Sequence, residues 1–125
     1  MIWLAVAAGG ALGSMARHGV NMLFAHVLER AVPYATASVN LAGSAAIGLL
    51  AALIATGRLH WSAELRTFVF VGILGGFTTF SSFMLDTFTL GHGGEHTIAF
   101  WNVALQIACG LAAVWSGYRF GVAIG

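Results

Sequence analysis

Residues 72–83 carry the residue types best suited to chemistry, because glycine, hydroxyl and aromatic side chains gather there in an apolar stretch. The glycine pair Gly75 and Gly76 precedes a run rich in threonine and serine. Such a composition makes a poor continuous helix and predicts a break. Backbone carbonyls set free at a break can coordinate a cation. The alternative is a flexible, closely packed helix that holds no ion.

Two phenylalanines lie in or just after this run. Phe80 and Phe83 are three residues apart and therefore share one helix face. Paired phenylalanines in an apolar helix usually pack or contact lipid. An aromatic ring also has a positive edge, so rings turned edge-on to a narrow path would stabilise a small, dehydrated anion. Asp86 follows three residues later on the same face.

The other polar residues in apolar surroundings are few. Thr36 and Asn40 are four apart, as are Asn102 and Gln106, so each pair shares a helix face. The Asn40 carboxamide offers two N–H donors and one acceptor; it either joins two helices or lines an anion path as a donor. Arg17 cannot lose its proton. It must reach a vestibule, a carboxylate or backbone carbonyls, and it either draws anions or fixes helix packing.

The elements that position these side chains are predicted to be membrane helices. The chain has 125 residues, of which 59% are hydrophobic and 7% charged, whereas a soluble domain carries roughly 25% charged residues. A membrane helix needs about 20 mostly apolar residues, and four windows fit: residues 2–27, 36–55, 65–90 and 97–123. We therefore predict an all-α membrane protein with a single four-helix transmembrane domain, residues 1–125. Such a chain is too small to form a pathway alone.

Composition also excludes several classes of function. The formal charge is +1 with neutral histidines, and the chain has no lysine, so it lacks the basic run with which proteins bind nucleic acid. No catalytic set of side chains is evident, which argues against an enzyme. Cys109 is the only cysteine, and we expect it to be a small packed residue.

Small residues recur at the spacing that lets membrane helices approach closely. The glycines four apart are Gly9 and Gly13, Gly72 and Gly76, and Gly117, Gly121 and Gly125. This spacing predicts tight packing but says nothing about function.

The arginines encode only a faint orientation. Arg58, Arg66 and Arg119 are predicted on the side of the termini, and Arg30 on the opposite side. Because arginine and lysine in short loops set membrane topology, so slight a bias suits a chain that inserts both ways round.

These features resemble the Fluc (CrcB) fluoride channels over essentially the whole chain. The resemblance is carried by the four-helix layout and by motifs in three helices: Gly10, Gly13 and Arg17; Thr36, Val39, Asn40 and Gly43; and residues 72–83. The last motif, with its Gly-Gly, its Thr-Thr-Phe and a second Phe three residues later, is the most specific.

The resemblance implies an antiparallel, dual-topology homodimer in the lipid of the bacterial inner membrane. It implies two fluoride pores per dimer, passive efflux of fluoride, and a central structural sodium ion held by backbone carbonyls. The fluoride pore would be lined by Asn40, Phe80, Phe83, Thr36, Ser81, Gln106 and Asn102. The sodium ligands would be the carbonyls of Gly75 and Thr78, and Arg17 would attract anions at the vestibule.

The chain departs from the family pattern at several positions. Ala35 replaces a Gly, Ser82 a Thr, Met84 a small hydroxyl residue and Asp86 a Glu, while Asn102 and Gln106 stand where a Tyr and Ser track is usual. The runner-up function is a proton-coupled exporter of the small multidrug-resistance kind, which needs a buried Glu in the first helix. That helix has Arg17 and no acidic residue. A non-transporting assembly subunit would explain the packing glycines but not residues 75–83.

Overall fold

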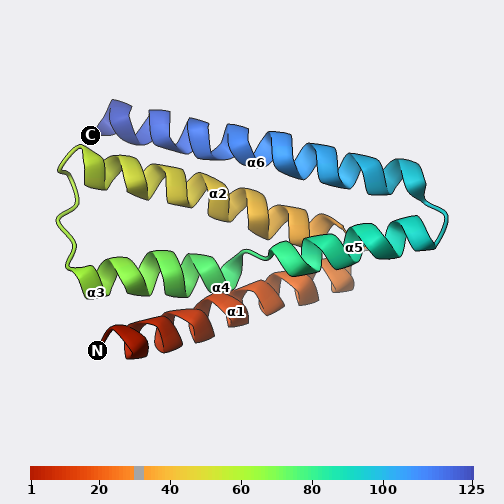
Figure 1. Cartoon of the computed structure of the whole chain (residues 1–125), viewed down its shortest axis with the longest axis horizontal. Helices are drawn as coiled ribbons and strands as arrows, with labels where there is room; N and C mark the ends of the chain where they lie inside the picture. The colour runs from red at the N-terminus through yellow and green to blue at the C-terminus, as the bar shows by residue number, and fades with distance from the viewer. Residues whose placement is uncertain (30–32) are drawn as a thin grey trace.

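The computed structural model describes residues 1–29 and 33–125, and Arg30 lies outside the described residues. The regular structure of the described residues is entirely helical (Figure 1). In chain order the elements are α1 (Ile2–Val27), α2 (Tyr34–Ala55), α3 (Ala63–Arg66), η1 (Thr67–Leu74), α4 (Gly75–Phe77), α5 (Phe80–His92) and α6 (His96–Ile124). The two termini lie at the same end of the molecule (Figure 1).

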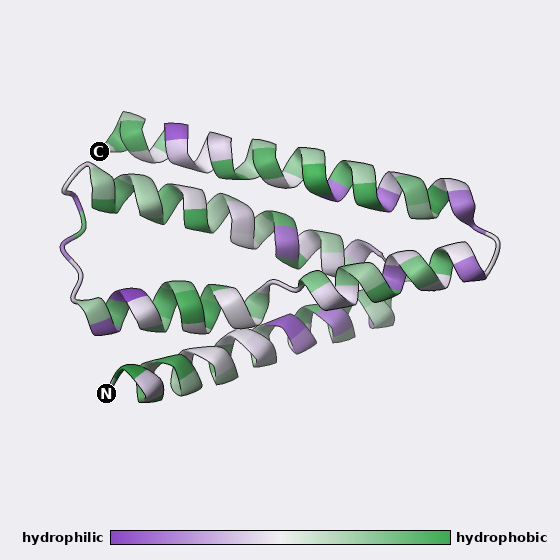
Figure 2. Ribbon diagram, viewed as in Figure 1, coloured by the Kyte–Doolittle hydropathy of each residue, from purple (hydrophilic) through white to green (hydrophobic). Residues whose placement is uncertain are grey.

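Three helical segments of the described residues are long and apolar enough to cross a membrane. They are Tyr34–Ala55, Ala63–His92 and His96–Ile124. Helix α1 has 26 residues, but Arg17 and His18 lower its apolar character, and Figure 2 shows hydrophilic colour along its second half. The first of the four expected spans therefore stays a prediction.

The helices pack in two pairs. Helix α2 lies along α6, and α1 lies along η1 and α4 (Figure 1). Glycines allow both approaches: a Cβ added at Gly9 would come within 2.8 Å of the Gly72 Cα, and one at Gly48 within 3.0 Å of the Val114 carbonyl carbon. Backbones this close gain dispersion contacts that larger side chains would prevent.

The helices bury little apolar surface within one chain. The buried apolar residues among those described are Ala35, Val39, Ala52, Phe83, Leu90 and Ala99. Cys109 is exposed, so the expectation of a packed cysteine is wrong. Among the described residues, α6 packs only against α2 and α5, and neither helix covers Cys109.

The third long segment changes its winding twice. Residues Thr67–Leu74 form a π-helix, a rare form that often occurs at functional sites. The α-helical turn Gly75–Phe77 follows, and then Thr78 and Thr79 are extended, with φ/ψ of −79°/158° and −153°/119°. Helix α5 starts at Phe80. Regular helical hydrogen bonding is thus interrupted in the middle of a segment long enough to span a membrane.

Candidate functional site

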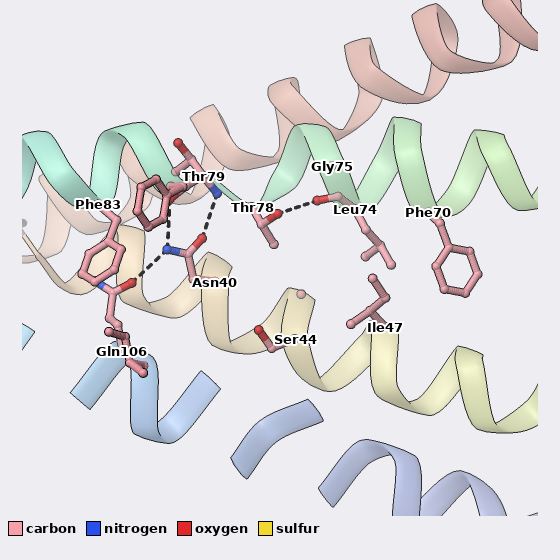
Figure 3. Close-up of a pocket in the computed structure, with 13 residues that line it drawn as sticks. Asn40, Ser44, Ile47, Phe70, Leu74, Gly75, Thr78, Thr79, Phe83 and Gln106 are labelled. Atoms are coloured by element: carbon pink, nitrogen blue, oxygen red, sulfur yellow. Dashed lines mark hydrogen bonds between the residues drawn. The ribbon is translucent and has the colours of Figure 1, made fainter. Parts of the chain in front are cut away.

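Thr78 and Thr79, where the helix is interrupted, line a cavity of about 400 Å³. The cavity lies between α2, the η1–α4–α5 segment and α6 (Figure 3). Apolar groups make up most of its wall, including Ile47, Leu74 and Phe83, and its polar side chains are few: Asn40, Ser44, Thr78, Thr79 and Gln106. A mostly apolar space with sparse polar groups is the usual lining of a selective site.

Asn40 of α2 holds the interrupted backbone from one side. Its Oδ1 accepts a hydrogen bond from the Thr79 N–H at 2.8 Å, and its Nδ2 donates to the Thr79 carbonyl at 3.2 Å (Figure 3). The same Nδ2 donates to Gln106 Oε1 at 2.8 Å. Both alternatives for Asn40 therefore stay open, since it joins helices and also presents its carboxamide to the cavity.

A chain of side-chain hydrogen bonds continues from Asn40 along α6. Gln106 Nε2 donates to Asn102 Oδ1 at 2.8 Å, and Asn102 Nδ2 donates to Thr87 Oγ1 at 2.9 Å. Thr87 Oγ1 donates to the Phe83 carbonyl at 2.8 Å, which closes the chain on α5. Gln106 and Asn102 are buried. The polar stripe expected on the last helix thus faces the α2–α5 side of the bundle rather than lipid.

The two phenylalanines have different surroundings. Both line the cavity, but Phe83 is 5% exposed whereas Phe80 is 73% exposed. Their ring centroids are 6.0 Å apart and the planes meet at 84°, so one ring turns its edge to the other. Within one chain, most of the Phe80 ring is without cover.

Two backbone carbonyls near the interruption lose their usual donors. In an α-helix the carbonyl of residue i accepts from the N–H of residue i+4. The partner of the Gly75 carbonyl would be the Thr79 N–H, which donates to Asn40 instead. The partner of the Thr78 carbonyl would be the Ser82 N–H, which donates to Thr79 Oγ1 at 3.2 Å.

Arg17 reaches the same segment from α1. Its Nη1 donates to the Thr78 carbonyl over 3.4 Å, a long hydrogen bond. We expected this guanidinium to reach a vestibule, a carboxylate or a backbone carbonyl, and in the structure it reaches a backbone carbonyl. A carbonyl oxygen has two lone pairs, so this contact leaves room for a second partner at Thr78.

The remaining expected site residues, Thr36 and Ser81, do not line the cavity. Thr36 is buried and its Oγ1 donates to Asp86 Oδ2 at 2.7 Å, across α2 and α5. Ser81 is exposed on α5 and is not among the residues that line the cavity. Of the expected pore residues, the structure therefore brings four to the cavity, namely Asn40, Phe80, Phe83 and Gln106, while Thr36, Ser81 and Asn102 do not line it.

Two polar residues of the cavity were not singled out from the sequence. Thr79 is buried, and its backbone is bound by Asn40 at both the N–H and the carbonyl. Its hydroxyl caps α5 by accepting from the Ser82 backbone N–H, and a threonine just before a helix is a readable N-cap signal. Ser44 lies one helical turn from Asn40 on the same face of α2, and that spacing was the available signal.

Comparison with known proteins gives matches over most of the chain. Residues 4–118 match the family described as CrcB-like protein, Camphor Resistance (CrcB). The protein named fluoride-specific ion channel FluC from Paracoccus denitrificans is 51% identical, covering 95% of this chain and 93% of its own. The proteins of the same name from Paramagnetospirillum magneticum and Rhodospirillum rubrum are 46% and 42% identical, covering 90% and 94% of this chain and 89% and 92% of their own.

These matches, taken with the three apolar spans, indicate a multi-pass membrane protein and not an enzyme. The inner membrane is the usual location of such a protein in bacteria. By a family match over nearly its whole length and by relatives that are about half identical, the chain belongs to the CrcB family.

Proposed function

We propose that this protein is a fluoride-selective channel that gives passive efflux of fluoride across the membrane. The relatives named fluoride-specific ion channels support fluoride as the transported ion. The observation that carries the proposal is the polar cluster of Asn40, Thr79 and Gln106, set against Phe83 in an otherwise apolar cavity. Sparse donors in an apolar path replace part of an ion's hydration without binding it too tightly for release.

In this mechanism Asn40 is the principal donor. One of its N–H groups is engaged with the Thr79 carbonyl and the other with Gln106 Oε1. The N–H shared with Gln106 is the one that fluoride would take, with Gln106 turning its own N–H groups toward the ion. Phe80 and Phe83 would contribute positive ring edges. Ser81, Thr36 and Asn102 would complete the lining on the α5–α6 side.

The pathway is proposed to form between two copies inserted antiparallel, with four spans in each copy and two pores per dimer. The exposure of Phe80 supports this assembly, since 73% of that side chain is uncovered in one chain. Gly75 is likewise exposed. A two-fold dimer places each of these residues twice at one self-complementary surface.

A sodium ion is proposed at the axis of that dimer, held by the carbonyls of Gly75 and Thr78. The chain fits such a ligand set, because both carbonyls have lost their α-helical amide donors to Asn40 and to the Thr79 hydroxyl. When bound, the ion would offset the partial negative charge of these carbonyl oxygens. Arg17, bonded to Thr78, adds positive charge at the same level of the bundle.

A liposome assay with a fluoride electrode tests the site assignment. We expect Asn40→Asp to lose most fluoride efflux, because a carboxylate repels the anion and removes the donor. Phe80→Ile should lower efflux by removing the ring edge while it keeps the apolar bulk. Val71→Ala serves as a control, since Val71 is exposed on η1 and does not line the cavity. Unchanged fluoride flux in both site variants would refute the site assignment.

A further inference from the structure

The interruption between α4 and α5 depends on a hydrogen bond that replaces a helical one. The Thr79 N–H donates to Asn40 Oδ1 at 2.8 Å. The last regular bond before it is from the Thr78 N–H to the Leu74 carbonyl at 3.0 Å. If the Thr79 N–H were released, its nearest helical acceptor would be the Gly75 carbonyl. Asn40 and Gly75 therefore compete for one amide proton.

The structure favours the bond from the Thr79 N–H to Asn40 over a bond to Gly75. Its carboxamide clamps the Thr79 backbone at two points, since it accepts from the N–H and donates to the carbonyl. Gln106 holds the Nδ2 end and is in turn held by Asn102. This second bond fixes which end of the carboxamide faces the Thr79 N–H. A side chain of the same size without polar atoms would provide neither bond.

The Gly75 backbone is open where the competing bond has been removed. Gly75 is exposed, and a Cβ added to it would meet only the Phe70 carbonyl, at 3.6 Å. The other carbonyl of the interruption, at Thr78, already accepts from Arg17. Of the two proposed cation ligands, the Gly75 carbonyl is thus the one that lacks its helical donor because Asn40 of another helix binds that donor.

We infer that Asn40 is a positioning residue for the cation site as well as a donor in the anion path. By holding the Thr79 amide, it keeps the Gly75 carbonyl free to coordinate sodium. This inference rests on the proposed function, of which the sodium ion is part. It links the two ions through one side chain, so that a change at Asn40 affects both sodium binding and fluoride flux.

The test compares Asn40→Leu with Gln106→Leu in the full-length protein. Each variant removes a carboxamide and breaks the bond between residues 40 and 106, but only Asn40→Leu releases the Thr79 N–H. The readout is the apparent sodium Kd, fitted from the rise in unfolding temperature as sodium replaces a large organic cation in detergent. A general loss of stability lowers the unfolding temperature at every sodium concentration but leaves this Kd unchanged.

We expect Asn40→Leu to weaken the apparent sodium Kd roughly 3- to 10-fold, the factor by which one hydrogen bond shifts an equilibrium. Gln106→Leu should stay within about twofold of the wild type, less than the effect of one ordinary hydrogen bond. Asn40→Asp keeps an oxygen that accepts from Thr79, so its sodium Kd should be no weaker than that of the wild type although its fluoride flux falls. If Asn40→Leu does not fold, Asn40→Ala also removes the acceptor of the Thr79 N–H and takes its place in the comparison with Gln106→Leu.

Three results would overturn the inference. They are an unchanged sodium Kd in Asn40→Leu, equal weakening in Gln106→Leu, or weakening in Asn40→Asp. A wild-type protein without any sodium response would overturn the proposed sodium site together with the inference. In the first three cases the wild-type sodium response and fluoride flux remain, so the proposed function survives.

Discussion

Replacement of Gly13 by alanine is expected to force α1 away from the η1–α4 segment. A Cβ at this position would lie 2.9 Å from the Phe77 amide nitrogen and 3.0 Å from the Ile73 carbonyl carbon, with the Ile73 carbonyl oxygen closer still. All three obstacles are backbone atoms. A flexible side chain can rotate away from an added methyl group, but a helix backbone must move as a body.

The expected destabilisation is about 3 kcal/mol. Added carbon atoms in a well-packed interior cost roughly 1–3 kcal/mol, and the upper end applies here because no side chain can give way. Alanine is favoured over glycine within a helix by about 0.5–1 kcal/mol, which offsets only part of this. The contact between Arg17 and Thr78, one turn farther along α1, should be lost as the helices separate.

The assay is thermal unfolding of purified protein, with fluoride efflux from liposomes measured in parallel. Gly10→Ala is the matched control on the same helix, because no atom lies within 4 Å of a Cβ added there. We expect Gly10→Ala to unfold at or slightly above the wild-type temperature and Gly13→Ala well below it. Equal unfolding temperatures for the two variants would refute the close approach of α1 to η1 and α4.

Two further changes test the packing around the cavity. Phe83→Ala should destabilise the protein by about 3 kcal/mol, since this buried ring leaves a hole, whereas Phe80→Ala should lower fluoride flux with much less effect on unfolding; similar unfolding for both would contradict the difference in burial. Thr36→Val should cost about 1–2 kcal/mol in unfolding free energy, because Asp86 loses a 2.7 Å hydrogen bond without a change in side-chain volume. If Thr36→Val unfolds like the wild type, that bond does not stabilise the fold.

Helix type and polar faces could be predicted because they depend on local composition and spacing. The glycine pair before a Thr and Ser run indicated where helical bonding would be weak, and the structure has Thr78 and Thr79 in extended backbone there. The spacing of Asn102 and Gln106 placed both on one face of α6. Their partners could not be predicted, because a face says nothing about which helix it meets.

The π-helix Thr67–Leu74 had no readable signal. Its sequence is apolar apart from Thr67, and the segment lies so close to α1 that a Cβ added at Gly9 would clash with the Phe68 carbonyl. Glycine spacing likewise marked Gly9 and Gly72 as contact residues without pairing them. The role of Thr79 was missed for a similar reason, since its backbone bonds to Asn40 join residues that are 39 apart in the chain.

The most direct test of the central claim is efflux of fluoride and of chloride from liposomes that contain the wild-type protein. A potassium ionophore would set the membrane potential, and pH would be equal on both sides. The proposed channel predicts rapid fluoride efflux, chloride efflux no faster than from empty liposomes, and no dependence on a proton gradient. Equal rates for the two anions, or fluoride efflux only with a proton gradient, would contradict it.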